Sequence, residues 1–322
     1  MTETVSKASP SRLGRLLRAA AGFAVLTALV AYVVVRYVSW DESTPGCVVR
    51  AVDGPDSGAE SETSFELTPE MAANAATISA VGTARGLPER AVTIALATAM
   101  QESMLLNISY GDRDSIGLFQ QRPSMGWGTT RQILDPVYSA GKFYEHLADV
   151  PGYSRLPLTE AAQRVQRSGH PHAYAKHEQE AAALAAALTG RAPAALTCTT
   201  GQQPGAGDPA KVRAELIRAF GDGVLPVAAG SGRAGAPRTA GSGAELRLPV
   251  IMTSGGGAKA AAKTRRGWEL AHWAVAQADA LRIAEVSYGD RVWVAGEAYE
   301  GWQRVGRAAG GAAGEVRIRV DQ

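Results

Sequence analysis

The feature that most constrains this 322-residue chain is an uncharged segment near its N-terminus. Basic residues dominate positions 1–18, and no charged residue occurs between Ala19 and Val35. With its apolar flanks, this segment is long enough to cross the hydrocarbon core of a bilayer as a helix. The sequence therefore predicts a transmembrane anchor at 19–40, with a basic cytoplasmic tail at 1–18.

The alternative to an anchor is a signal peptide that is removed after export. The apolar run is long for a signal peptide, and no A-x-A cleavage site follows it. Basic residues before the run, with Asp41 and Glu42 after it, place the N-terminus on the cytoplasmic side. We therefore expect a single-pass protein of the cell membrane whose globular part lies outside the cytoplasm.

The chain has only two cysteines, Cys47 and Cys198, which bracket the region richest in helical patterns. Outside the cytoplasm an even number of cysteines favours a disulfide. A bond that closes so long a loop contributes about 4–5 kcal/mol on the chain-entropy model, and two unpaired thiols are the alternative. Neither cysteine lies in a CxxC or CxxH pattern, which excludes a zinc site built on cysteine.

Start and stop signals for helices are dense in the first half of the chain. Thr68-Pro69 begins one pattern, Pro88 a second that runs to about Met104, and Asp135-Pro136 a third. A short fourth helix is predicted from Thr159, and an Ala-rich fifth from His172 to Leu188. A further amphipathic helix is predicted at 208–220.

The last part of the chain has a different pattern. After a low-complexity Gly/Ala/Ser segment, strand-like alternation occurs at 246–251, 285–288, 291–295 and 316–320, around a helical pattern at 268–281. The predicted fold class is a mainly α domain after one transmembrane helix, plus a small α+β domain. The predicted division is an acidic linker at 41–66, the mainly α domain at 67–200, a helix and flexible linker at 201–243, and the α+β domain at 244–322.

The residues that carry chemistry lie in the stretch 100–128. Glu102 ends the second helical pattern, on one face with Ala95, Thr98 and Ala99. A carboxyl group that emerges from such a small, apolar face is partly desolvated, which favours the protonated form that a general acid requires. An ordinary surface glutamate near a helix end is the alternative.

A turn rich in Gly and Asp follows, and it leaves room for the chain to fold back opposite Glu102. Asp112 is then the candidate for the second carboxylate, the base that holds water in an inverting glycosidase. A turn-forming aspartate is the alternative. Gly117 lets the backbone approach a ligand closely, and Gln120 offers an amide to the N-acetyl groups of a sugar.

These residues resemble a known family of wall-degrading enzymes. Glu102-Ser103 followed by Ser115-Ile116-Gly117-Leu118-Phe119-Gln120 is similar to the E-S…S-x-G-x-x-G-L-M-Q signature of lytic transglycosylases. Gly111-Asp112-Arg113 ahead of it resembles the corresponding segment of goose-type lysozymes even more closely. Ala173-Tyr174-Ala175 resembles the A-Y-N motif, whose tyrosine hydrogen-bonds the catalytic glutamate.

The resemblance implies a lysozyme-like fold for 67–200, peptidoglycan as the substrate and no cofactor. It implies that Glu102 is the catalytic acid and that Asp112 positions water. The residues that it places at the sugar cleft are Ser115, Gly117, Leu118, Phe119, Gln120 and Tyr174. Hydrolysis usually needs two carboxyl groups and the route to an anhydro-muramyl product needs one, and both routes are compatible with these residues.

The C-terminal region has a weaker resemblance, carried by the segment from Gly267 to Trp293. It is similar to zinc peptidase modules of the D-Ala-D-Ala carboxypeptidase type, whose closing strand carries H-x-H. Here that strand reads Arg317-Ile318-Arg319, and arginine is not a normal zinc ligand. We therefore expect no metal and no peptidase activity, and a degenerate module that binds wall peptide or a protein partner.

Together these features predict an enzyme that cleaves peptidoglycan glycan strands at the outer face of the membrane. The alternative function is a catalytically inactive wall-binding or assembly protein with the same fold, which Ala175 in place of the motif's Asn would allow. Net charge of +2 gives no electrostatic case for nucleic-acid binding. A transporter is excluded, because one span without an acidic residue or histidine cannot line a pathway.

Overall fold

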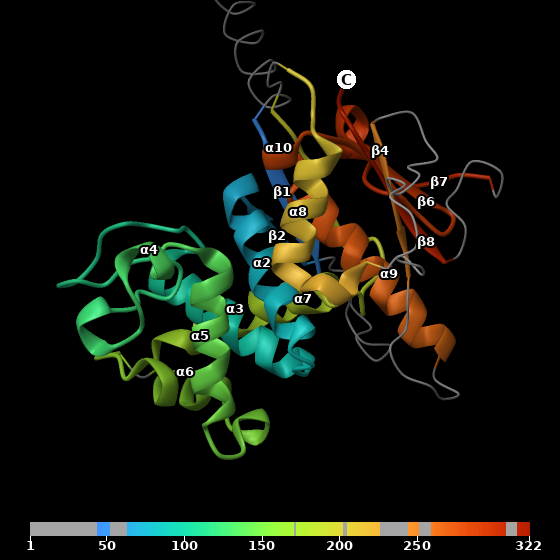
Figure 1. The fold of residues 1–322 in the computed structure, drawn as a ribbon. Helices are drawn as coiled ribbons and strands as arrows, with labels where there is room; N and C mark the ends of the chain where they lie inside the picture. Colours follow the sequence, from blue (N-terminus) through green and yellow to red (C-terminus); the bar gives the residue numbers. More distant parts are fainter. Residues whose placement is uncertain are drawn as a thin grey trace, which may run out of the picture. The chain divides into compact units, whose positions relative to one another are not determined.

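The computed structural model describes residues 44–51, 63–170, 172–201, 205–225, 244–250, 259–306 and 314–322, and the fold is given for these. Those from Pro45 onward belong to one compact unit. The helices are α2 (Pro69–Ala84), α3 (Glu89–Ser103), α4 (Thr130–Ile133), α5 (Pro136–Ala148), α6 (Leu158–Gln166), α7 (Glu178–Leu188), α8 (Pro209–Phe220), α9 (Lys259–Ala276) and α10 (Ala278–Leu281) (Figure 1). The strands are β1 (Gly46–Arg50), β2 (Ser64–Leu67), β3 (Leu196–Thr199), β4 (Glu245–Pro249), β5 (Ile283–Tyr288), β6 (Arg291–Val294), β7 (Gln303–Arg304) and β8 (Glu315–Val320).

Helices α2 and α5 begin where the local sequence signals predict, whereas α9 begins nine residues before the predicted 268 and α4 was not predicted. The Thr68 hydroxyl accepts a hydrogen bond from the Met71 backbone N–H at 3.2 Å, and Pro69 occupies the first turn of α2. Asp135 caps α5 in the same way, accepting from the Val137 N–H at 2.9 Å. The predicted fifth helix is divided into a 3-10 turn, η3 (Ala173–His177), and α7.

A sheet near the N-terminus corrects the predicted fold class. Strand β1 pairs antiparallel with β2 and with β3, and its residues Cys47 and Val49 are buried. The predicted fold class, a mainly α lysozyme-like domain after one transmembrane helix plus a small α+β domain, is therefore wrong, because the described residues contain two antiparallel sheets. The sequence conceals β1 because it is short, lies in a segment rich in acidic residues and pairs with a strand about 150 residues away.

The two cysteines lie opposite each other on β1 and β3. Cys47 faces Cys198 in the register of the sheet, and the predicted disulfide between them is confirmed. The transmembrane helix of the predicted fold class has no counterpart here: no helix in the described ranges is long and apolar enough to cross a membrane. The predicted tail at 1–18 and span at 19–40 lie outside those ranges.

Small residues let the helices around the core approach closely. On α2, a Cβ atom at Gly82 would lie 2.7 Å from the Tyr144 hydroxyl oxygen, so that glycine makes room for the buried ring of α5. The Tyr144 hydroxyl donates to the Ile78 carbonyl oxygen at 3.0 Å. Fully buried alanines, including Ala95 on α3 and Ala185 on α7, have the same effect along the other helices.

The C-terminal region forms a five-stranded antiparallel sheet in the order β4-β8-β5-β6-β7. Strands β4, β5, β6 and β8 agree with the predicted ones to within a few residues, and β7 was not predicted. Helix α9 packs across β5 and β8. The approach is close at Gly267, because a Cβ atom there would overlap with the ring of Tyr288 on β5.

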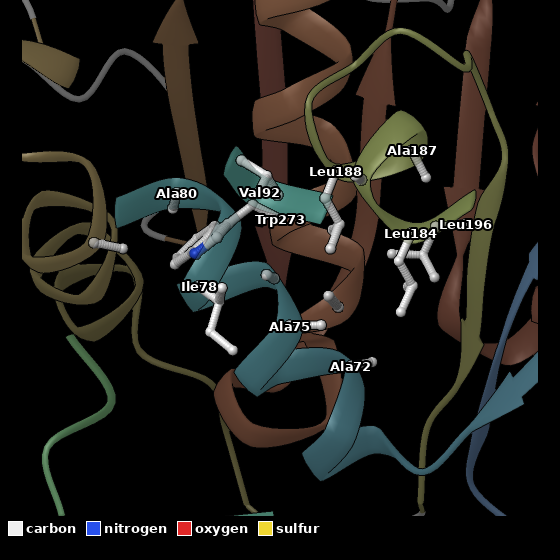
Figure 2. Packing of buried hydrophobic residues seen from close by; sticks show 14 of the residues in the cluster. Ala72, Ala75, Ile78, Ala80, Val92, Leu184, Ala187, Leu188, Leu196 and Trp273 are labelled. Carbon is white, nitrogen blue, oxygen red and sulfur yellow. The ribbon is translucent and has the colours of Figure 1, made fainter. Parts of the chain in front are cut away.

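Residues of α9 and of the segments after it join the C-terminal region to the rest of the protein. The Gln277 amide donates to the Ala73 carbonyl oxygen of α2 at 3.1 Å, and the Trp302 indole donates to the Leu196 carbonyl oxygen of β3 at 2.8 Å. Figure 2 shows Trp273 of α9 among the buried residues of one hydrophobic cluster, which includes Ile78 of α2 and Leu188 of α7. The core therefore continues without a break from the helices into the C-terminal region.

A buried histidine of α9 makes the stability of this junction depend on pH. Burial lowers the pKa of His272 to about 4, and its Nδ1–H donates to the Ala187 carbonyl oxygen at 2.7 Å. The pKa in an unfolded chain is about 6.5, so below that pH the unfolded state binds more protons. The stabilisation is complete above about pH 6.5 and is lost as the pH falls toward 4, which should lower the free energy of unfolding by about 3 kcal/mol.

Urea unfolding at pH 7 and pH 4 measures this loss. In His272→Asn the amide keeps an N–H donor near Nδ1 and does not titrate. We expect the difference in unfolding free energy between the two pH values to be about 3 kcal/mol smaller in this variant. Equal differences in wild type and variant would show that His272 does not couple folding to protons.

Candidate active site

Glu102 lies in the last turn of α3, half-buried at the edge of the core. The predicted small face of this helix is present, because Ala95, Thr98 and Ala99 are fully buried. The hydroxyl of Tyr174, which comes from η3, donates to Glu102 Oε1 at 2.8 Å. This is the hydrogen bond that the A-Y-N resemblance leads one to expect.

Tyr174 is a buried and rigid partner for that carboxyl group. Its side chain is fully enclosed, and burial raises the pKa of its hydroxyl well above the usual value. The hydroxyl therefore stays protonated at any physiological pH and acts only as a donor to Glu102. The arrangement holds one oxygen of the carboxyl group in place, and the structure gives the other oxygen no hydrogen bond within the described residues.

The backbone turns sharply immediately after Glu102. Met104 and Leu105 both have positive φ, at 54° and 61°, which is costly for residues with a Cβ atom. The turn is held by burial of Leu105 and by the Asn74 amide, which donates to the Leu105 carbonyl oxygen at 2.8 Å. This places Glu102 at a corner of the chain and not along a continuing helix.

The Gly117–Gln120 segment forms the tip of a tight hairpin beside that corner. Ile116 and Gln121 exchange backbone hydrogen bonds of 3.0 and 2.9 Å across it. Gly117 has φ of 77°, and a Cβ atom there would lie 2.9 Å from the Ile133 carbonyl oxygen. The close approach predicted at Gly117 is thus an approach to the backbone of α4.

Two side chains bind the hairpin to the helices that carry the site. The hydroxyl of Ser103, next to Glu102, donates to the Leu118 carbonyl oxygen at 2.8 Å, and the Gln166 amide of α6 donates to the Phe119 carbonyl oxygen at 2.8 Å. Neither role was predicted. For Ser103 the sequence did contain a signal, the Glu102-Ser103 pair of the motif, because a serine at that position can reach the loop that follows.

The predicted cleft residues divide into buried and accessible ones. Ser115, Gly117, Leu118 and Phe119 are buried, and the Phe119 ring stacks on Phe143 with centroids 4.6 Å apart. Their side chains therefore position the hairpin from the core side and do not face solvent.

Gln120 is half-buried at the hairpin tip. Its amide donates to the Tyr110 and Gly117 carbonyl oxygens, each at 3.3 Å. Its side chain lies against Gly111, where a Cβ atom would overlap with it. Gln120 therefore braces the preceding turn, which presents Tyr110 with 73% of its surface exposed.

Asp112, the predicted second carboxylate, lies in solvent on that turn. Its side chain is 91% exposed, and its Oδ2 atom lies 4.0 Å from Arg113 Nε. Within the described residues no hydrogen bond joins it to Glu102.

The carboxylate that organises this turn is Asp114. It accepts from Arg122 Nε and from the Ser124 backbone N–H, each at 2.8 Å. Hydrogen bonds from Ser124 and Arg122 hold the pKa of Asp114 well below its usual range, so it is ionised under all ordinary conditions. The sequence contained a signal for this role in the Arg122-Pro123-Ser124 run, but only the folded chain shows that the run returns to Asp114.

In the part of the chain that the structure describes, no group of three His, Cys, Asp or Glu side chains is placed to hold a metal ion. On β8, the strand that carries H-x-H in the peptidase modules, both arginines form ion pairs: Arg319 with Glu285 and Arg317 with Glu315. A search against models of known protein families finds no match, and a search among curated proteins finds no significant relative.

Proposed function

We propose that this chain cleaves the glycan strands of peptidoglycan as a lytic transglycosylase, with Glu102 as the acid. The observation that carries the proposal is the single held carboxyl group: Glu102 is bound by a buried tyrosine at 2.8 Å, whereas Asp112 is 91% exposed. The resemblance of the surrounding motifs to lytic transglycosylases supports the same substrate class. The disulfide fits a place of action outside the cytoplasm, where such bonds persist.

One carboxyl group suffices for the non-hydrolytic reaction. Protonated Glu102 gives its proton to the glycosidic oxygen as the bond from that oxygen to the sugar C1 breaks. The C6 hydroxyl of the same muramyl sugar then attacks C1, and its proton returns to the Glu102 carboxylate. The products are a shortened strand and an anhydro-muramyl end, and the acid is regenerated without a water molecule.

The test is incubation of the purified full-length chain with purified sacculi, followed by mass spectrometry of the soluble products. We expect anhydro-muramyl ends, which are lighter by one water than reducing ends. Reducing ends would overturn the non-hydrolytic route and restore a role for a second carboxylate. Binding to sacculi without any product would overturn the enzyme proposal and favour a wall-binding protein.

Tyr174→Phe tests the contact that holds the acid. The variant keeps the ring but removes the hydrogen bond to Glu102. A hydrogen bond to a charged group is worth about 1.5–3 kcal/mol, so we expect kcat to fall about 10- to 100-fold. Tyr144→Phe is the matched control, because it removes a buried hydroxyl that donates to the Ile78 carbonyl oxygen, and kcat should stay near the wild-type value. Equal kcat in both variants would contradict the role of Tyr174.

A further inference from the structure

A cavity of about 350 Å³ lies at the junction between the helices and the C-terminal region. Its walls are the end of α2, the end of α8 with the turn after it, the end of β4 and one face of α9. Helices α8 and α9 both pack on α2 (Figure 1). None of the residues assigned to the site at Glu102 lines this cavity, and its volume is sufficient for a small organic molecule.

Glu269 of α9 brings a carboxylate into the wall of the cavity. Only 7% of its side-chain surface is exposed. One oxygen, Oε2, accepts a hydrogen bond from Arg266 Nη1 at 2.7 Å. The other, Oε1, is buried and has no hydrogen-bond partner among the residues that the structure describes. Buried carboxylate oxygens are nearly always paired, so this one indicates a donor that binds in the cavity.

Arg266 is held in place beside that carboxylate. It comes from the preceding turn of α9, and its guanidinium group lies over the ring of Phe220, 4.7 Å from the ring centroid. Its one ion pair within the described part of the chain uses Nη1. The remaining N–H groups of the guanidinium are therefore donors for an acceptor such as a carboxylate.

The other buried residues of the lining are apolar. They are Phe220, Val224 and Leu270. Ala262 adds a small side chain on the same face of α9 as Arg266, one turn away. Apolar surface beside a charged pair suits a ligand that has one apolar part and one polar part.

The ion pair has no net charge, and this restricts the polar part of the ligand. A ligand with a net charge would bring an uncompensated charge to groups that are largely removed from water. A zwitterion does not, because its cation pairs with Glu269 and its anion with Arg266. These two side chains are neighbours on one helix, so the cation and the anion of the ligand must also be neighbours. An α-amino acid meets this condition, because it carries both groups on one carbon atom.

We propose that this cavity binds an apolar α-amino acid. A rotation of the Glu269 carboxyl group about its last side-chain bond brings Oε1 to the ligand, whose ammonium group then donates to it. The ligand's carboxylate accepts from the remaining N–H groups of Arg266, and its side chain packs on the apolar lining. Binding is reversible, involves no covalent step and is independent of the reaction proposed for Glu102.

Titration calorimetry of the purified full-length chain tests the proposal, with each enantiomer of leucine as a probe. We expect at least one enantiomer to bind saturably, with a Kd below about 1 mM. Leucinamide lacks the carboxylate, and 4-methylpentanoic acid lacks the ammonium group. Each should bind about tenfold more weakly or not at all, because it leaves one charged group of the cavity without its partner.

Ala262→Leu fills the cavity and removes neither charged group, so it should abolish leucine binding. Ala261→Leu is the matched control, because Ala261 is exposed and lies outside the lining. It should leave leucine binding unchanged. Urea unfolding of both variants checks that each is folded.

Glu269→Gln keeps the shape of the side chain without its charge and should weaken leucine binding about tenfold. If the loss of the ion pair unfolds this variant, Ala262→Leu decides. The proposal is overturned if neither enantiomer binds, which would show that a water molecule alone pairs with Oε1. It is also overturned if leucinamide or 4-methylpentanoic acid binds as tightly as leucine, or if Ala262→Leu binds leucine like the parent.

Discussion

Replacing Glu102 by Gln is expected to lower kcat for release of soluble fragments from sacculi about 10³-fold, with the free energy of unfolding within about 1 kcal/mol of wild type. Gln has nearly the same shape, and its carbonyl oxygen can still accept the hydrogen bond from Tyr174. It has no acidic proton to give to the glycosidic oxygen. Initial rates on sacculi and urea unfolding of the same preparation measure the two quantities.

Asp112→Asn is the second variant to measure, because it tests whether the reaction uses one carboxyl group or two. It removes a carboxylate from the same stretch, but one that is 91% exposed, so the one-carboxylate reaction predicts kcat within about threefold of wild type. A loss as large as that of Glu102→Gln would show that Asp112 takes part and that the reaction is hydrolysis. Full activity of Glu102→Gln would contradict the proposed role of Glu102 as the catalytic acid.

Loss of the disulfide between Cys47 and Cys198 is expected to lower the free energy of unfolding by about 4–5 kcal/mol. The bond closes a loop with a sequence separation of 151, and this loop contains both Glu102 and Tyr174. Breaking it releases the unfolded chain from that constraint, so the unfolded state gains conformational entropy. Denaturant unfolding of the oxidised protein, with and without a reductant, measures the change.

The double variant with Ala at both cysteines separates the bond from other effects of the reductant. It should unfold at the same denaturant concentration with and without reductant, close to that of the reduced wild type. Both cysteines are buried within paired strands, so a small packing loss adds to the entropic one. Wild-type protein that unfolds identically in both conditions would show that the bond does not constrain the unfolded chain.

Much of the helical architecture could be predicted because its signals are local. The caps Thr68 and Asp135, each followed by proline, start α2 and α5 at the expected residues. Strands β1 and β3 mark the limit of such local signals. Strand β3 was not predicted, and β1 was assigned to a linker. Each is short, and its stability comes from a partner distant in the sequence, so no window of residues around Val49 or Leu196 reveals the pairing.

The candidate site likewise contains one part that was predicted from the sequence and one part that was not. The motif containing Glu102 and the one containing Tyr174 were found in the sequence, and the hydrogen bond between them is present. The contacts that hold the neighbouring backbone, from Asn74 and Gln166, were not foreseen. Amides that donate to a distant carbonyl oxygen leave no periodic pattern, so only the folded chain identifies them.

The contact between α9 and the site-bearing helices limits how this protein can be recombined. The carbonyl oxygen of Ala187, at the end of α7, has its donor in His272, and the large ring of Trp273 joins the cluster built on the small residues of α2. A genetic exchange that joined residues 67–200 to a different C-terminal region would lose both at once. The helices around Glu102 and the sheet after them therefore have to be transferred together if both contacts are to be kept.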